Sequence, residues 1–253
     1  MELVVIFVLG LSAGSFINVC IYRIPRGMSV ITPRSFCPAC KTTLRWYELV
    51  PVLSYLLLRR KCRTCQRLDP SSGARISLRH PIVELLCGVV FVFLYSLDGP
   101  STDFMAHALL FTLLLSIFVI DWKHLIIPNG IIITGLVLGI AMYSLVSLHD
   151  LITAVGSGLL CAAVMFVFRW IGNAAFNKET MGMGDIKLSA LIGLFVGIEN
   201  FLFALWAAAV IGCLYWLVEH FIMGSQKDMK LPFGSFLSLT SFVIFSFNPV
   251  IYL

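Results

Sequence analysis

Charged residues are scarce in this chain of 253 residues, of which only 12% are Asp, Glu, Lys or Arg. Because a soluble domain carries roughly 25% charged residues, the composition argues against a soluble protein. Hydrophobic residues make up 59% of the chain. Most of its length is therefore needed for membrane spans, and the sequence predicts an all-α polytopic membrane protein.

Polar stretches long enough to fold outside a membrane are also rare, and the connection 22–80 is the one exception. The rest of the chain divides into eight apolar segments, at about 2–21, 81–97, 105–120, 126–148, 151–171, 186–198, 201–223 and 232–252. We predict about eight transmembrane helices, of which 186–198 is the shortest. The predicted domains are a first helix (1–21), a loop (22–80) and a helical membrane domain (81–253).

Lys and Arg are missing from every second connection. With the N-terminus outside, the basic residues all fall in or beside the cytoplasmic connections 22–80, 121–125, 172–185 and 224–231. This follows the positive-inside rule and also places the C-terminus outside. The net charge of +5 is therefore a topology signal. It predicts contact with membrane lipid and gives no support for a nucleic-acid partner.

A basic segment is missing before the first apolar run, which begins Met1-Glu2. Basic residues follow the run instead, unlike those of a secretory signal peptide. We expect it to be retained as a helix.

Four cysteines mark the 22–80 loop. They form the pairs Cys37-Pro-Ala-Cys40 and Cys62-Arg-Thr-Cys65, separated by twenty-one residues. Two such knuckles can complete a tetrahedral thiolate site, and a bound metal would help to fold a loop this small. The spacing predicts structural zinc; the alternative is a pair of reduced or redox-active motifs.

Two acids lie at the edges of apolar runs. Asp121 ends one run, and Asp185 closes Gly182-Met183-Gly184-Asp185 before the next. A carboxylate inside the membrane costs roughly 2.5–3.5 kcal/mol on insertion scales. The predicted topology puts both acids at cytoplasmic helix ends, where they could meet. Two close carboxyls share one proton, which is the chemistry of an aspartic protease.

Each acid also has a simpler interpretation. Asp121 could be an interfacial acid paired with Lys123 or His124, and Asp185 could cap the helix that follows it. Gly182 and Gly184 would let another chain approach the acid closely. Lys187 could lower the pKa of Asp185 or merely anchor its helix, and the sequence does not decide between these.

Two further polar residues stand in apolar runs. Glu84 could pair with Arg79 or His80 near the membrane surface. Asn18 lies on a polar face of the first helix with Ser12 and Ser15. Its simplest role is hydrogen bonding between helices, and the alternative is contact with a substrate or cofactor.

A series of motifs runs nearly end to end. The motifs are Gly14-Ser-Phe-Ile-Asn-Val-Cys-Ile-Tyr-Arg-Ile-Pro25, the four-cysteine loop, Trp46-Tyr-Glu-Leu-Val-Pro51, Ser77-Leu-Arg-His-Pro-Ile-Val-Glu84, Ile120-Asp121 followed by Ile127-Pro-Asn129, Glu179-Thr-Met-Gly-Met-Gly-Asp-Ile-Lys187, and Pro232-Phe-Gly234. In this order they resemble the type IV prepilin peptidases of bacterial inner membranes. His80 and Met183 depart from the family pattern, where Tyr and Gly are usual.

The resemblance implies a function. Members of the family cut the basic leader from prepilins or pseudopilins after a glycine, then methylate the new N-terminal amine with S-adenosylmethionine. It implies that Asp121 and Asp185 are catalytic, and it associates Glu84 with methyl transfer or structural integrity. We expect Asn18 to be a second residue associated with methyl transfer. No S-adenosylmethionine motif of the soluble Rossmann type is present, so methyl transfer follows from the resemblance alone.

Other functions remain open on the residues alone. A related Gly-x-Gly-Asp intramembrane protease would cleave without methylating. A transporter would use the two acids as a proton relay. A membrane scaffold would use the cysteine loop to bind a partner, and its acids would be separately replaceable.

Overall fold

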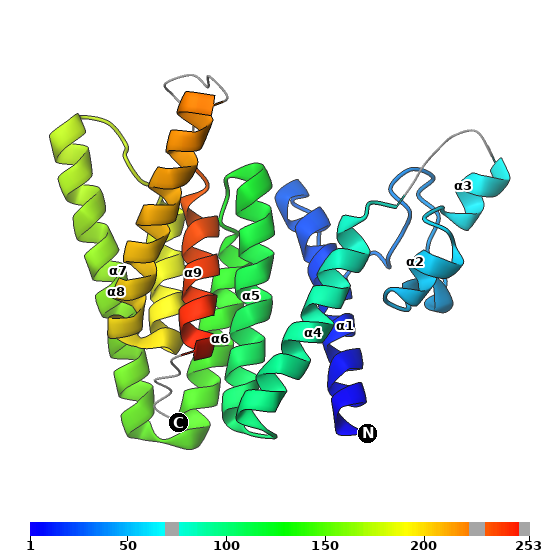
Figure 1. Cartoon of the computed structure of the whole chain (residues 1–253), viewed down its shortest axis with the longest axis horizontal. Helices are drawn as coiled ribbons and strands as arrows, with labels where there is room; N and C mark the ends of the chain where they lie inside the picture. The colour runs from blue at the N-terminus through cyan, green and yellow to red at the C-terminus, as the bar shows by residue number, and fades with distance from the viewer. Residues whose placement is uncertain (69–75, 223–230, 248–253) are drawn as a thin grey trace. The chain divides into compact units, whose positions relative to one another are not determined.

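The computed structural model describes residues 1–68, 76–222 and 231–247, and all regular elements within these ranges are helices. The chain forms two compact units, Met1–Pro100 and Ser101–Leu253. Figure 1 shows the order of their helices along the chain. The predicted all-α class is therefore confirmed. The predicted division at residues 21 and 80 concerns function, and it stays a prediction.

The N-terminal unit is built on two long helices, α1 (Glu2–Arg23) and α4 (Arg79–Asp98). Glycine allows them to touch backbone to backbone. A Cβ on Gly10 would lie 2.6 Å from the carbonyl oxygen of Cys87, and one on Gly14 would lie 2.6 Å from the Cα of Glu84. This spacing of small residues is typical of helix pairs that pack inside a membrane.

The connection between α1 and α4 carries only short elements. They are η1 (Ile24–Arg26), η2 (Trp46–Leu49), α2 (Leu53–Leu57) and α3 (Arg63–Leu68). Arg23 ties the start of this connection to the end of α1. Its buried guanidinium donates hydrogen bonds to the carbonyl oxygens of Ser29, at 3.0 Å, and Arg34, at 3.2 Å.

The C-terminal unit is a helical bundle. Its elements are α5 (Thr102–His124), α6 (Asn129–Val146), α7 (Leu148–Phe176), α8 (Met183–Ile222) and α9 (Phe233–Phe247). Helix α8 packs against α6, α7 and α9, and α9 also packs against α5. Large apolar side chains such as Phe195, Phe201 and Phe245 are fully buried in this bundle.

Helix α8 reverses direction at Gly197. This residue has φ 76° and ψ 165°, outside helical geometry and accessible chiefly to glycine. A straight helix of 40 residues would measure about 60 Å. Instead, the charge of Asp121 acts on Asp185 at one end of α8, while the ring of Tyr215 lies 5.6 Å from that of Trp122. Both parts of α8 thus meet the end of α5, so they are two antiparallel arms.

The expected spans coincide with helices, and the count of eight membrane spans stays a prediction. Within the described residues, six helices are long and apolar enough to cross a membrane, and α9 is a shorter apolar helix. The expected spans 186–198 and 201–223 both belong to α8, because the reversal at Gly197 takes only one residue. The expected span 232–252 ends beyond residue 247, outside the described residues.

Candidate active site and metal centre

Asp121 is buried in the last turn of α5, and its side chain is 5% exposed. Its Oδ2 atom accepts two hydrogen bonds from Ser235 on α9, from the backbone N–H at 2.8 Å and from the hydroxyl at 3.1 Å. The Ser235 hydroxyl also lies 3.0 Å from the carbonyl oxygen of Phe118. The partner of Asp121 is therefore Ser235, in place of the Lys123 or His124 considered from the sequence.

Asp185 lies in the first turn of α8, and the charge of Asp121 acts on it electrostatically. Backbone N–H groups of Gly182 and of Asp185 itself donate to its carboxylate. These bonds satisfy free N–H groups at the start of α8, as the helix-capping interpretation predicted. The half-buried Asp185 also lies within electrostatic range of the buried Asp121, which a simple cap does not require.

Glycines bring three segments close together around the two acids. A Cβ on Gly184 would lie 3.0 Å from Cβ of Ile127. One on Gly234 would lie 2.8 Å from Cδ1 of Ile127 and 3.0 Å from Oδ2 of Asp121. Side chains at these two positions would push α8 and α9 away from the end of α5. Gly182 lies beside Asp185, where an added Cβ would be 3.3 Å from Oδ2.

Lys187 lies one turn into α8, two residues after Asp185. Its Nζ donates a hydrogen bond of 3.0 Å to Oδ1 of Asn129, the first residue of α6. Lys187 therefore anchors the start of α8 to the start of α6, which was one of the two roles considered for it.

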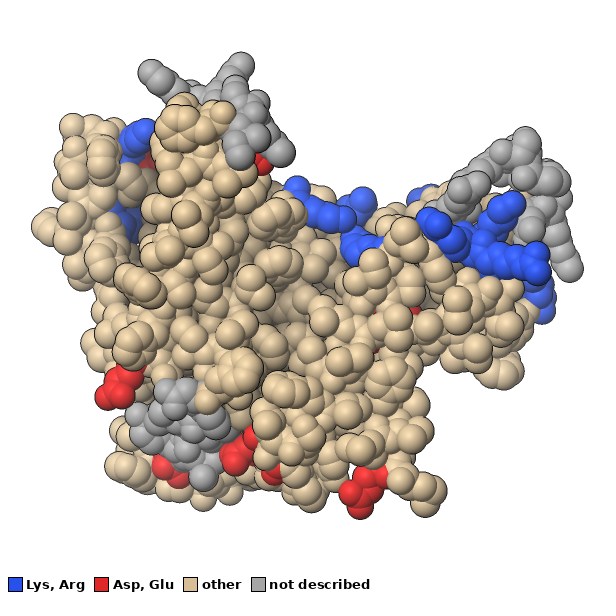
Figure 2. All heavy atoms as spheres, viewed as in Figure 1, with Lys and Arg blue, Asp and Glu red and all other residues tan. Residues whose placement is uncertain are grey.

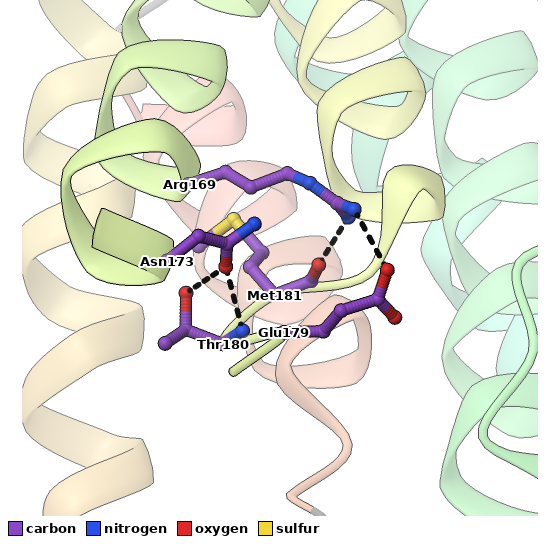
Figure 3. Close-up of polar contacts among 5 residues, drawn as sticks. All are labelled: Arg169, Asn173, Glu179, Thr180 and Met181. Atoms are coloured by element: carbon purple, nitrogen blue, oxygen red, sulfur yellow. Dashed lines mark hydrogen bonds and ion pairs between the residues drawn. The ribbon is translucent and has the colours of Figure 1, made fainter. Parts of the chain in front are cut away.

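The segment before Gly182 is held by the end of α7 (Figure 3). The Arg169 guanidinium donates to the carbonyl oxygen of Met181 and pairs with Glu179 at 3.4 Å. Asn173, one turn later, accepts hydrogen bonds from the backbone N–H of Thr180, at 2.9 Å, and from its hydroxyl, at 3.0 Å. We call Arg169 and Asn173 the α7 clamp. They hold residues 179–181, which end four positions before Asp185.

Glu84 and Asn18 belong to the N-terminal unit, and each binds backbone there. Oε2 of Glu84 accepts a hydrogen bond of 2.7 Å from the N–H of Val52, and Ser15 also bonds to this carboxylate. Nδ2 of Asn18 donates to the carbonyl oxygen of His80 at 3.1 Å. Asn18 thus links α1 to α4, as its simplest interpretation predicted. The proposed partners of Glu84, Arg79 and His80, are replaced by the loop and by α1.

The four cysteines of the loop come together. Sγ of Cys37 lies 3.7 Å from Sγ of Cys65, and Sγ of Cys40 lies 3.8 Å from Sγ of Cys62. All four sulfur atoms lie within 4.8 Å of one another, and none is in a disulfide. A tetrahedral site with Zn–S bonds of about 2.3 Å places its sulfurs about 3.8 Å apart. The cluster therefore fits a zinc ion.

The pKa values of three of these thiols are also shifted, and in different directions. Hydrogen bonds from Thr42 lower the pKa of Cys40 to about 6. A hydrogen bond to Cys40 raises the pKa of Cys65 to about 12, and burial raises the pKa of Cys37. Without a metal, the lowered pKa favours the thiolate of Cys40, and the raised pKa values keep Cys37 and Cys65 protonated. A metal would have to displace those protons.

Ser235 and the α7 clamp were missed from the sequence. Ser235 directly follows Pro232-Phe-Gly234, so its place beside a recognised motif was a usable signal. Arg169 is a charged residue within the apolar run 151–171, which also marks it as unusual. Asn173 carried no such signal, because its partner Thr180 is seven residues away in an irregular segment.

Two known families match this chain. Residues 8–97 match the family described as Bacterial Peptidase A24 N-terminal domain, and residues 108–217 match the Type IV leader peptidase family. The two matches lie on either side of the boundary between the compact units.

Individual relatives cover both units. A Myxococcus xanthus protein named Prepilin leader peptidase/N-methyltransferase is 36% identical, over 83% of this chain and 62% of its own length. A Bacillus subtilis protein of the same name is 34% identical, over 96% of this chain and 94% of its own. The Escherichia coli Type 4 prepilin-like proteins leader peptide-processing enzyme is 34% identical, over 91% and 88%. No solved structure is significantly similar to this chain.

Proposed function

Since this chain belongs to the type IV leader peptidase family, we propose that Asp121 and Asp185 are the catalytic pair with which it removes the leader from prepilins. The enzyme is a prepilin peptidase that is also an N-methyltransferase. One observation carries the assignment of the acids. The end of α5 and the start of α8 come together around Ile127, since Gly184, directly before Asp185, and Gly234, beside Oδ2 of Asp121, both pack against its side chain.

The chemistry follows from the shared proton. One carboxylate takes a proton from water, which attacks the scissile carbonyl carbon, while the protonated acid donates a hydrogen bond to the carbonyl oxygen. The proton then passes to the leaving amine as the peptide bond breaks. We leave the two roles unassigned, because the titration belongs to the pair.

Ser235 is suited to either role of Asp121. When Asp121 is ionised, the serine hydroxyl can donate to the carboxylate across 3.1 Å. When Asp121 is protonated, the same hydroxyl can accept from the acid and donate to the Phe118 carbonyl across 3.0 Å. One residue thereby keeps the acid hydrogen-bonded before and after proton transfer.

The charge of the substrate determines on which side of the membrane its scissile bond lies. A prepilin has a basic leader followed by an apolar helix, so the leader stays in the cytoplasm for the same reason as the basic loops of the enzyme. The scissile bond, after a glycine, would then lie at the cytoplasmic face of the bacterial inner membrane. Asp121 and Asp185 lie at this face if the N-terminus is outside.

The N-terminal unit supports our proposal for methyl transfer. S-adenosylmethionine would supply the methyl group to the newly freed amine. Asn18 offers a candidate contact, because its Oδ1 is buried and meets no donor among the described residues. Glu84 would act by holding the loop at Val52. Zinc, held by Cys37, Cys40, Cys62 and Cys65, would supply structural stability to that loop.

The decisive experiment incubates the purified enzyme with a prepilin in detergent. Mass spectrometry should find leader loss and an added methyl group on the mature N-terminus. Asp121→Asn and Asp185→Asn should each abolish cleavage, since neither acid can replace the other. Asp150→Asn is the matched control, because Asp150 lies in the first turn of α7, away from the α7 clamp. This variant should cleave prepilin normally. Substantial cleavage by either active-site variant would overturn the assignment.

A further inference from the structure

The loop between α1 and α4 presents apolar side chains that nothing in the described chain covers. Trp46 is 75% exposed, Leu53 51%, Leu56 64% and Leu57 73%. The three leucines fall at i, i+3 and i+4 of α2, so they lie on one face of that helix. We call η2 and α2, residues 46–57, the apolar segment of the loop. Exposed apolar side chains gathered in this way mark a contact surface.

A hydrogen bond to α4 fixes how far along that helix the apolar segment lies. Val52 donates to Glu84, which is five residues into a helix that starts at Arg79. At 1.5 Å per residue, this contact lies about 8 Å along α4 from its start. Figure 1 agrees, since α2 lies beside the upper part of α4 and below its end. That depth is where amphipathic segments bury their apolar faces in a bilayer.

The backbone at Val52 is locked in this position. Val52 has φ 60° and ψ −49°, and the N–H of Leu53 bonds to the carbonyl oxygen of Pro51 at 2.5 Å. This is a γ-turn of the rare, strained type. A β-branched residue adopts it only where its surroundings hold it there, and the Glu84 carboxylate supplies that restraint.

Basic residues flank the apolar segment on both sides. Between residues 41 and 65 the chain has six Lys or Arg and a single acid, Glu48. The Glu48 carboxylate is already bonded to the backbone N–H of Arg45. Figure 2 shows blue side chains gathered over this connection and acidic ones at the opposite end of the same unit. Positive charge beside exposed Trp and Leu suits the anionic surface of a bilayer.

We propose that the apolar segment inserts into the leaflet that holds the adjoining ends of α1 and α4. Trp46, Leu53, Leu56 and Leu57 enter the boundary between headgroups and acyl chains. The flanking Arg59 and Lys61 bind the phosphates of anionic phospholipids. Because Cys62 follows directly, the cysteine cluster is held at the membrane surface. This docking requires only that α1 and α4 span a membrane, so it stands apart from the peptidase assignment.

The test uses Trp46 as a depth probe in the full-length protein. The other four tryptophans, Trp122, Trp170, Trp206 and Trp216, are changed to Phe, and the protein is placed as single copies in nanodiscs without prepilin. Lipids brominated near the headgroup end of the acyl chain should quench most of the Trp46 emission, and aqueous acrylamide should quench little. A protein that keeps only Trp206, a highly exposed residue of α8, is the control for lipid contact.

Two results would overturn the insertion. Strong quenching by acrylamide without quenching by bromolipid would place Trp46 in water. Shielding from both quenchers would mean that protein covers it.

A second arm tests the headgroup contact. Changing Arg59 and Lys61 together to Gln should reduce bromolipid quenching in phosphatidylglycerol nanodiscs and leave it unchanged in phosphatidylcholine. The matched control is Lys178→Gln, an exposed lysine of the C-terminal unit, which should have no effect in either lipid. Equal quenching of the double variant and the parent in phosphatidylglycerol would refute phosphate binding.

Discussion

At Asp121, one carboxylate oxygen receives two hydrogen bonds from a single residue, Ser235. The backbone donor cannot be removed by changing the side chain, but the hydroxyl donor can. Gly234, directly before it, has no room for a Cβ, because that atom would lie 3.0 Å from the same oxygen. Asp121 is thus positioned by α9, more than a hundred residues further along the chain.

Ser235→Ala should lower kcat for prepilin cleavage by about 10- to 100-fold, since a hydrogen bond to a charged group contributes about 1.5–3 kcal/mol. KM should change little, because the serine contacts the acid. Steady-state kinetics with a purified prepilin would measure both constants. Ser238→Ala is the control, since the Ser238 hydroxyl donates to the Gly234 carbonyl oxygen one turn away. An unchanged kcat in Ser235→Ala would show that the hydroxyl has no part in catalysis.

The cysteine cluster gives a second prediction at this scale. With Cys65 at a pKa of about 12 and the pKa of Cys37 also raised, both thiols are protonated at neutral pH when no metal is bound. Zinc binding must release these protons, so zinc affinity should fall as the pH falls. Calorimetry of the metal-stripped protein in buffers of different ionisation enthalpy would count the protons released.

The zinc content of single cysteine variants provides the controls for this experiment. The purified protein should carry about one zinc ion per chain, by the four-thiolate chemistry of such sites. Cys37→Ser or Cys62→Ser should lose it, whereas Cys213→Ser, an exposed cysteine on α8, should keep it. Zinc binding without proton release would contradict the raised pKa values.

At the scale of elements, the α7 clamp holds the segment that leads to Asp185. Arg169→Ala and Asn173→Ala should each reduce cleavage by about 10- to 100-fold, because small displacements of a catalytic group are costly. Hydrogen exchange should rise at Thr180 and Met181 and stay unchanged in α5. Arg169→Lys should rescue little, since lysine lacks the two-pronged guanidinium.

Lys178→Ala tests whether any change in this connection has the same effect. Lys178 is exposed beside Glu179 and lies outside the clamp. The Lys178→Ala variant should cleave prepilin normally. Equal losses in Lys178→Ala and Arg169→Ala would point to the whole connection and against a specific clamp.

Local patterns in the sequence predicted much of this architecture, and contacts between distant segments explain what they missed. Apolar runs located the helices, and cysteine spacing located the cluster, because both depend on neighbouring residues. The reversal at Gly197 was hidden, since one glycine in a continuous apolar stretch carries little signal. The Glu84–Val52 and Asn173–Thr180 contacts depend on how loops pack against helices, which periodicity does not encode.

For the whole molecule, the two units suggest that the two activities can be separated. The amine that accepts a methyl group exists only after the peptide bond is cut. Asp121→Asn and Asp185→Asn should therefore give no methylated product from full-length prepilin. They should still methylate a pre-cut pilin, because Asn18, Glu84 and the cysteine cluster all belong to the other unit.

Variants of the N-terminal unit should behave in the opposite way. Glu84→Gln should spare cleavage and reduce methylation, as measured by mass spectrometry of both products. If well-folded variants of Asp121 or Asp185 failed to methylate pre-cut pilin, the two sites would not be separate.

The predicted orientation can be tested with lysine alone. All seven lysines fall in or beside the connections assigned to the cytoplasm. A membrane-impermeant amine reagent added to spheroplasts should therefore label the Met1 amine and no lysine. Lysed spheroplasts should then show labelling at exposed lysines such as Lys41 and Lys178. Modification of Lys123 in intact spheroplasts would reverse the assignment of sides.

The reversal at Gly197 also affects the surrounding lipid. The first arm of α8 runs from Met183 to Val196 and measures about 21 Å. It is shorter than the hydrocarbon core of about 30 Å. Such hydrophobic mismatch is relieved when the bilayer thins around the short arm. Headgroups and water would then reach closer to Asp185, and a substrate segment would cross less hydrocarbon on its way to the acids.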